Sequence, residues 1–269
     1  AAKVAEASGL SYDAAFRRAW EAVDAKSRAS NWPTIFYAMC DETRVRAQAE
    51  RELDFMTLMG QVTQRFPRTV QSSGSYSVSF RTRPEDADDM QLWHQRFFGA
   101  LDISSLNVHD PTVMDEASRL GKTVHIYNQG RTRYSFGLYQ WSEFRKGVKA
   151  RWQWHLNVMH GYQFFDLDGR EPDTAMLCYG RDAIYPTLDF ERCREGAEDF
   201  YLYSTLSQLA DTVRARHPQS AALPPAETML RQLDDAVSLD QRQPPQGYEP
   251  QALKRRAIAL CEDLTAALP

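Results

Sequence analysis

The chain has 269 residues, of which 43% are hydrophobic and 25% are charged, so it is long enough to bury a sizeable core in one or two domains. Its 32 basic and 36 acidic side chains give a net charge of -4, which argues against a protein that binds nucleic acid through its phosphates. No apolar run approaches the roughly 20 residues of a membrane-spanning helix, and the first nine residues lack the apolar centre of a signal peptide.

The cysteines and aromatic residues add little on their own. Cys40, Cys178, Cys193 and Cys261 are far apart and show no metal-ligand spacing, so we expect free thiols and neither a metal nor an organic cofactor. Aromatic residues make up 12% of the chain and cluster near predicted strand ends. Flat aromatic rings are used both by carbohydrate sites and by protein cores, and this pattern alone favours neither.

In chain order, the hydrophobic pattern alternates between helices and strands. The spacing of Ala15, Phe16, Trp20 and Val23 predicts an amphipathic helix over 11–30, and the apolar run over 34–40 is typical of a strand covered on both faces. Further elements follow in the same manner: a helix over 45–65, strands over 68–80 and 101–108, a helix over 111–120, a strand over 122–127, a short helix over 142–146, a strand over 150–158, a short strand near 176–179 and a long helix over 190–216.

Alternating strands and helices predict a parallel sheet with helices outside it. No glycine-rich phosphate loop follows an early strand, which argues against an open nucleotide-binding sheet. We therefore predict a (β/α)8 TIM-type barrel that lacks its first strands in this chain, because only about five barrel strands can be counted. The predicted domains are the later part of the barrel over 1–216 and a proline-punctuated C-terminal helical extension over 217–269, with helices near 226–239 and 251–268.

The carboxyl ends of barrel strands are where such enzymes place their chemistry. The first predicted strand ends in Asp41 and Glu42. Two adjacent carboxyl groups that are partly shielded from water raise one pKa and leave the other group ionised, so that one can protonate a leaving group while its neighbour stabilises positive charge. The alternative is that the two acids begin a loop and cap the next helix.

Several segments resemble a known family. Residues 34–42 resemble the strand and Asp-Glu pair of glycoside hydrolases that use substrate-assisted catalysis. The block with Arg194, Gly196 and Asp199, together with 186–191 before it and the aromatic and leucine-rich stretch 201–206, resembles the segment that closes the barrel in glycoside hydrolase family 123 and its DUF4091-like relatives. The Trp-rich stretch 141–154 is similar to the last strand of that group, and the resemblance extends in order over roughly residues 11–206. Thr43 stands where the group often has proline.

The resemblance implies a glycosidase of the β-N-acetylhexosaminidase kind, active in carbohydrate metabolism and polysaccharide degradation, with a periplasmic or secreted location. It would cleave a 2-acetamido-β-glycoside, such as a β-N-acetylgalactosaminide, with retention and without an enzyme nucleophile. Glu42 would protonate the glycosidic oxygen and later act as base on water, while Asp41 would orient the acetamido N–H. Arg194, Glu195 and Asp199 lie on a predicted helix, and we expect them to form ion pairs that fix the closing segment.

Other residues are placed around the acid pair as substrate-binding candidates. Tyr127 would donate to the acetamido carbonyl, and Trp152 or Trp154 would form a wall of the pocket. The alternative for the two tryptophans, which share one face of their strand, is core packing. His125, in the middle of a strand, is interpreted as a hydrogen-bonded core histidine. Candidates for sugar hydroxyls are Asn107, His109 and Asn128, where His109 also fits a loop turn.

Three hypotheses remain open from the sequence. The first is the substrate-assisted hexosaminidase, and the second is a barrel glycosidase in which Glu42 works with a separate carboxylate nucleophile such as Asp110. The third is a non-catalytic carbohydrate-binding barrel. The expected partners are a glycan or oligosaccharide substrate and an N-terminal remainder of the same protein that would complete the barrel; no nucleic acid and no membrane span are expected.

Overall fold

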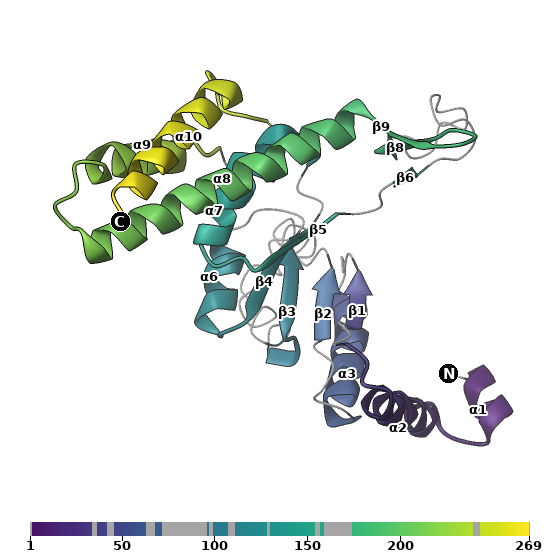
Figure 1. Ribbon diagram of the computed structural model, residues 1–269. Helices are drawn as coiled ribbons and strands as arrows, with labels where there is room; N and C mark the ends of the chain where they lie inside the picture. Colours follow the sequence, from purple (N-terminus) through teal and green to yellow (C-terminus); the bar gives the residue numbers. More distant parts are fainter. Residues whose placement is uncertain are drawn as a thin grey trace. The chain divides into compact units, whose positions relative to one another are not determined.

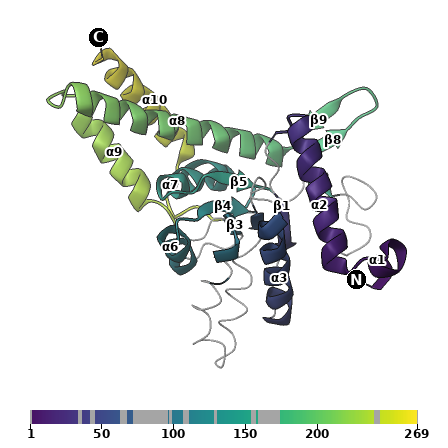
Figure 2. The ribbon, with the colours of Figure 1, turned by 90° about the horizontal axis from the view of Figure 1, so that it is seen from below.

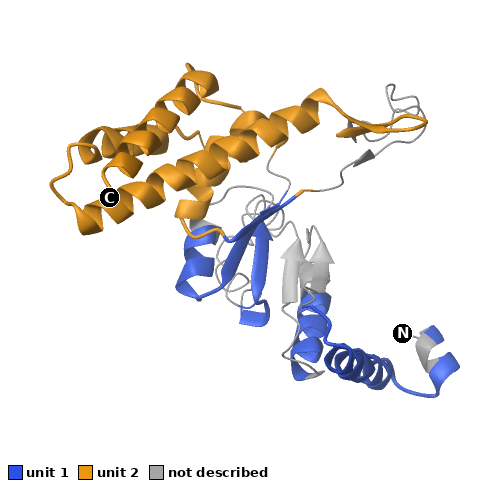
Figure 3. Ribbon diagram, viewed as in Figure 1, with its two compact units in different colours: residues 1–127, 149–152 blue, residues 128–148, 153–269 orange. Residues whose placement is uncertain are grey.

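The computed structural model describes residues 2–33, 37–41, 46–62, 68–71, 96, 99–106, 111–127, 130–153, 157–158, 174–238 and 243–268. They form two compact units, which Figure 3 distinguishes by colour. The first unit contains Ala1–Tyr127 and Lys149–Trp152, and the second contains Asn128–Val148 and Gln153–Pro269. The boundaries of these units differ from the predicted domain boundary at 216/217.

The first unit is built on a five-stranded parallel sheet whose strands are hydrogen-bonded in chain order (Figure 1). Because every strand runs in the same direction, all five carboxyl ends lie at one edge of the sheet. The strands are β1 (Tyr37–Asp41), β2 (Arg68–Gln71), β3 (Ile103–Leu106), β4 (Thr123–Tyr127) and β5 (Ala150–Trp152), and the helices are α1 (Ala2–Ser8), α2 (Tyr12–Ala29), α3 (Arg46–Val62) and α6 (Pro111–Arg119).

The core of the first unit lies at strands β3 and β4 and the elements around them. Leu101, Ile103, Leu106, Val124 and Ile126 are buried, as expected for central parallel strands rich in branched apolar residues. The helix ends follow local rules. Ser11 caps α2 by accepting a hydrogen bond from the backbone N–H of Ala14, and Gly121 follows α6 with a φ of +65°. The predicted helix over 11–30 and strand over 122–127 are thereby confirmed.

The predicted eight-stranded barrel is wrong. A closed barrel gives every strand two neighbours, whereas among the residues that the structure describes β1 pairs only with β2, and β5 pairs only with β4. The strands described after β5 do not extend the parallel sheet either. It forms two small antiparallel sheets, β6 (Asn157–Val158) with β7 (Thr174–Ala175) and β8 (Leu177–Tyr179) with β9 (Ile184–Pro186).

The second unit is mainly helical. The 29-residue helix α8 packs against the other helical elements of the unit, and Figures 1 and 2 both show α9 and α10 next to it. Its interior includes the buried side chains of Trp141, Tyr203, Leu206, Met229 and Leu264. The helical elements are a π-helical turn η2 (Ser135–Tyr139), α7 (Gln140–Arg145), α8 (Leu188–Arg216), α9 (Leu223–Asp235) and α10 (Pro250–Ala266).

Two glycines allow η2 and α8 to cross closely. A Cβ atom added to Gly196 would lie 2.6 Å from the carbonyl oxygen of Arg133 and 2.6 Å from the Cβ of Phe136. A Cβ added to Gly137 would lie 3.2 Å from the Cβ of Asp199. The absence of side chains at these two positions therefore sets how near the π-helical turn approaches the long helix.

A buried ion pair holds the same crossing. Arg133 donates from Nε and Nη2 to the two carboxylate oxygens of Asp199, at 2.6 and 2.9 Å, and from Nη1 to Glu195 at 3.1 Å. Asp199 is fully buried, and Arg133 is nearly so. The hydrogen bonds that Arg133 donates to Asp199 raise the pKa of the guanidinium, which therefore stays charged. The expectation that Glu195 and Asp199 form structural ion pairs is confirmed, with Arg133 as the partner.

The segment between α9 and α10 contacts the same region. The hydroxyl of Tyr134 accepts a hydrogen bond from the backbone N–H of Ser238 at 2.8 Å, and the Tyr134 ring packs edge-on against Tyr248 with centroids 5.3 Å apart. Burial raises the pKa of Tyr248, which keeps the phenol neutral. The C-terminal helices are thus attached to the residues that neighbour the Arg133 ion pair.

Within the described part of the chain, no helix has both the length and the apolar character required to cross a membrane.

Gly196→Ala is expected to destabilise the protein by about 1–3 kcal/mol, because the new methyl group overlaps the backbone at Arg133. An alanine in an ordinary helix interior would instead stabilise by about 0.5–1 kcal/mol relative to glycine. Urea unfolding measures the difference. Gln208→Ala, an exposed change on the same helix α8, is the control and should leave the unfolding midpoint nearly unchanged. A neutral or stabilising Gly196→Ala would contradict the close crossing.

Asp199→Asn is expected to cost about 3 kcal/mol of unfolding free energy, because it leaves the buried guanidinium of Arg133 without its main counter-charge. The matched control is Asp234→Asn, which breaks the exposed Arg145–Asp234 pair and should cost less than about 1 kcal/mol. Denaturant unfolding of both variants under the same conditions gives the comparison. Equal losses of unfolding free energy in the two variants would show that the buried pair stabilises the protein no more than the exposed pair does.

Candidate functional site

Three of the predicted site residues lie at the carboxyl edge of the parallel sheet. Asp41 ends β1, Tyr127 ends β4 and Trp152 ends β5. Asp41 pairs with Gln71 on the neighbouring strand, and Tyr127 pairs directly with Trp152. This edge is where parallel sheets bind ligands.

The other predicted site residues lie outside the described residues. They are Glu42, Asn107, His109, Asn128 and Trp154. Each follows a described strand closely in the sequence: Glu42 after β1, Asn107 and His109 after β3, Asn128 after β4, and Trp154 after β5. Their proposed roles remain predictions.

The strand order separates the acidic end of the edge from its aromatic end. Neighbouring strands lie about 4.8 Å apart, so β1 and β4 are separated by about 14 Å and β1 and β5 by about 19 Å. Tyr127 and Trp152 are brought together, whereas Asp41 lies three to four strands away. A ligand that reaches both ends must be longer than one sugar ring.

The aromatic end contains a buried histidine as well. Trp152 donates from its indole Nε1 to Nδ1 of His125 at 2.7 Å, and the two rings lie 5.8 Å apart at an angle of 43°. His125 is only 5% exposed, while Trp152 is 42% exposed. Burial lowers the pKa of His125 and so favours the neutral ring. The prediction of a hydrogen-bonded core histidine is confirmed, but no local sequence pattern indicates that its partner is Trp152.

Strand register produces this pairing. Residues two apart on a strand share a face, so His125 and Tyr127 point to the same side of the sheet. Their direct partners on β5 are Ala150 and Trp152. Ala150 has only a methyl group, which leaves room for the indole of Trp152 to reach back diagonally to His125.

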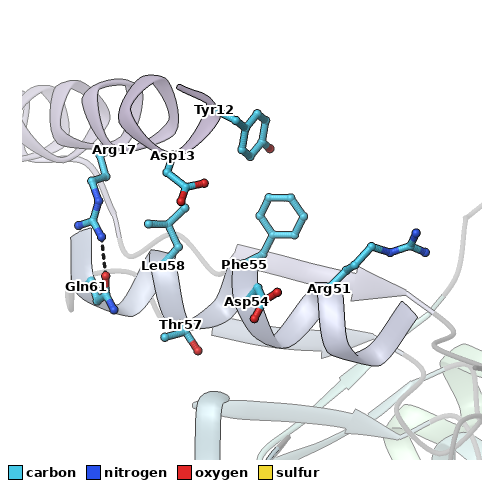
Figure 4. A pocket seen from close by; sticks show the side chains of 9 residues that line it. All are labelled: Tyr12, Asp13, Arg17, Arg51, Asp54, Phe55, Thr57, Leu58 and Gln61. Carbon is cyan, nitrogen blue, oxygen red and sulfur yellow. Dashed lines mark hydrogen bonds between the residues drawn. The ribbon is translucent and has the colours of Figure 1, made fainter. Parts of the chain in front are cut away.

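A cavity of about 510 Å³ lies elsewhere in the first unit, between α2 and α3 (Figure 4). Tyr12 and Phe55 contact each other edge-on at 5.7 Å and form its aromatic part. The cavity is also lined by two acidic residues, Asp13 and Asp54, and by the basic residue Arg51. The cavity contains none of the predicted site residues, and we assign it no chemistry.

Potential metal ligands do not gather in the part of the chain described by the structure. No group of three or more histidine, cysteine or acidic side chains is close enough there to hold a metal ion. Cys178, Cys193 and Cys261 are free thiols, and Cys193 donates to the backbone carbonyl of Arg131.

A scan against protein-family models finds no match for this chain, and no curated protein matches its sequence. The functional assignment therefore depends on the residues at the carboxyl edge of the sheet.

The free energy of unfolding is expected to fall as the pH drops below about 6.5, the ordinary pKa of histidine. Because burial lowers the pKa of His125 in the folded protein, the unfolded chain binds the proton first, and acid therefore favours unfolding. Urea unfolding at pH 7.5 and 5.5 measures this loss.

His125→Asn should show a smaller loss between the two pH values, since asparagine does not titrate. His217→Asn, at an exposed histidine after α8, is the control and should behave like the wild type. If His125→Asn kept the full pH dependence, burial of a neutral His125 would not contribute to it.

Proposed function

We propose that this chain is a retaining glycoside hydrolase that cleaves a 2-acetamido-β-glycoside of the β-N-acetylgalactosaminide kind. The observation that supports the proposal most is the position of Asp41 at the carboxyl end of β1, directly before Glu42, on the sheet edge that also carries Tyr127 and Trp152. An acid that ends one strand and aromatic residues that end two others, on an edge of the kind that binds ligands, suit the cleavage of an oligosaccharide.

In the proposed first step, Glu42 donates its proton to the glycosidic oxygen while the bond from that oxygen to the anomeric carbon breaks. The carbonyl oxygen of the substrate's own acetamido group attacks the same carbon and forms an oxazolinium ion. Asp41, as a carboxylate, accepts the acetamido N–H and balances the positive charge. In the second step the Glu42 carboxylate takes a proton from water, and the water oxygen attacks the anomeric carbon. The bond from that carbon to the acetamido oxygen breaks, which opens the oxazolinium ring and restores the acetamido group.

The adjacency of the two acids favours this reaction over one with a separate enzyme nucleophile. In the two-carboxylate mechanism the groups stand on opposite faces of one sugar ring, about 5–5.5 Å apart. Residues 41 and 42 are consecutive in the sequence, and Asp41 is the last residue of β1. They approach a bound sugar from one side, which suits an acid and a residue that orients the acetamido group.

The aromatic end of the edge is assigned to a second sugar. Because Trp152 lies four strands from Asp41, it would contact a ring removed from the bond that is cleaved. Tyr127 ends its strand about 14 Å from Asp41, so the proposed function no longer uses it as the donor to the acetamido carbonyl. It is buried and supports the Trp152 indole from the neighbouring strand. The substrate is therefore an oligosaccharide or a longer glycan.

Glu42→Gln is expected to lower kcat on an aryl N-acetyl-β-galactosaminide by about 10²–10⁴-fold, because it removes the general acid and base. Asp41→Asn should also slow the reaction, since the acetamido group loses its orienting carboxylate. The corresponding aryl glycosides without the N-acetyl group should not be cleaved. Release of the aryl alcohol is the measurement, and Glu50→Gln, at an exposed acid on α3, is the matched control with wild-type activity expected.

Two results would contradict the proposal. Equal cleavage of the non-acetylated glycosides would indicate a separate nucleophile such as Asp110. Sugar binding without cleavage, unchanged in Glu42→Gln, would indicate a carbohydrate-binding protein without turnover.

A further inference from the structure

The exposed indole of Trp152 is attached to a buried imidazole. Trp152 lies on β5, which is an edge strand among the described strands, and 42% of its surface is open to solvent. Its Nε1–H nevertheless points into the sheet and donates to His125 Nδ1 at 2.7 Å. The ring is thus fixed at its polar end while part of the side chain remains accessible.

This hydrogen bond restricts both partners. An exposed aromatic side chain normally samples several rotamers, whereas a hydrogen bond to a rigid strand residue selects one of them. The buried Nδ1 of His125 in turn needs a donor, which the indole supplies. An Nδ1 that accepts must carry no proton, so the ring is neutral with its proton on Nε2.

We propose that His125 is a positioning residue for Trp152: it holds the indole in one orientation, so that the exposed ring face binds a sugar unit removed from the cleaved bond. The inference rests on the proposed function and extends it, since it assigns a role in substrate binding to a residue that does not touch substrate. Its physical basis is preorganisation, because a ring that is already oriented loses less freedom when the sugar binds.

The surroundings of His125 keep the imidazole neutral. Ser105 on β3 and Tyr127 on β4 share its face of the sheet. Arg151 pairs with Ile126, the residue after His125, and therefore lies on the opposite face of the sheet. Lys149 is exposed, and Glu116 on α6 forms an ion pair with Arg119. Burial is the cause of the lowered pKa of His125. A protonated His125 has donors on both nitrogens and cannot accept the indole hydrogen, so acid should release Trp152.

The first test detects the hydrogen bond itself. The indole N–H resonance of Trp152, identified by its loss in Trp152→Phe, is followed by NMR in protein labelled with ¹⁵N-tryptophan. His125→Phe keeps the ring volume but removes the acceptor, and it should shift this resonance. His125→Asn places an oxygen acceptor near the position of Nδ1 and should keep the resonance near its wild-type position at pH 7, in neutral and in acid solution alike. The wild-type resonance should move once acid protonates His125. A resonance that does not change in His125→Phe would overturn the proposal.

The second test separates binding from chemistry. The substrates are an aryl glycoside of N-acetylgalactosamine and the aryl glycoside of its β-linked trisaccharide. In His125→Phe we expect KM for the trisaccharide to rise about five- to tenfold, the range of one lost hydrogen bond, with kcat unchanged. KM for the monosaccharide should not change, since that substrate does not reach Trp152. His125→Asn should restore the wild-type KM.

The controls are matched in type and exposure. Trp32→Phe removes another exposed tryptophan of the first unit, and His217→Asn removes an exposed histidine of the second unit. Neither variant should change KM for the trisaccharide. In the Trp152→Phe background, His125→Phe should have no further effect. A fall in kcat on both substrates, or no rescue by asparagine, would show that His125 acts only on the fold and would overturn the proposal.

The two proposals can fail separately. If the wild type cleaves neither substrate, the proposed function is wrong, and the trisaccharide is then used as a ligand in the NMR experiment. A shift of the Trp152 indole resonance on addition of trisaccharide, weakened in His125→Phe and kept in His125→Asn, would still support the positioning role. No shift with the wild type would overturn it.

Discussion

The parallel register of the five-stranded sheet is the constraint on which the candidate site depends. Since all strands run in one direction, Asp41, Tyr127 and Trp152 end their strands at the same edge. The pairing of Tyr127 with Trp152 also places the indole two residues beyond Ala150, diagonal to His125. A slip of β5 by one residue would turn Trp152 to the other face and remove its hydrogen bond. The register therefore fixes the position of the aromatic end and the orientation of its exposed ring.

The second unit depends on a different interaction, the close crossing of η2 and α8. Gly137 and Gly196 remove the side chains that would keep the two backbones apart, and the Arg133–Asp199 pair supplies a specific contact across the crossing. These residues explain in physical terms most of the block that resembles a family motif. Gly196 and Asp199 are required by packing and charge, whereas Arg194 lies at the surface and pairs with Glu191 and Glu198. The contacts that the structure describes for this block are therefore structural ones.

Local sequence patterns predicted the helices and strands. They could not predict which strands pair, because pairing joins residues that are far apart in the chain. The cap at Ser11, the glycine at 121 and the apolar alternation over 122–127 predict their helix and strand because each depends on neighbouring residues. Barrel closure depends on whether a first and a last strand meet, which no local pattern encodes, and the hairpin strand β9 was missed for the same reason. Asp41 could be placed at a strand end because an apolar run stops there. The partnership of His125 with Trp152 joins residues 27 apart and became visible only in the folded sheet.

The separation of the acids from the aromatic ring has a consequence for catalysis. Interactions with a distant part of a substrate can be used to orient the reacting part, so that a shortened substrate loses rate as well as affinity. If the proposed function holds, an edge with Asp41 at the end of β1 and a fixed indole on β5 would divide these tasks between its two ends. In the proposed function the aromatic end would hold the glycan in register, because the Trp152 ring is already oriented by the buried His125. The proposed acidic end would then need to recognise only one feature of the substrate, the acetamido group beside the bond that breaks.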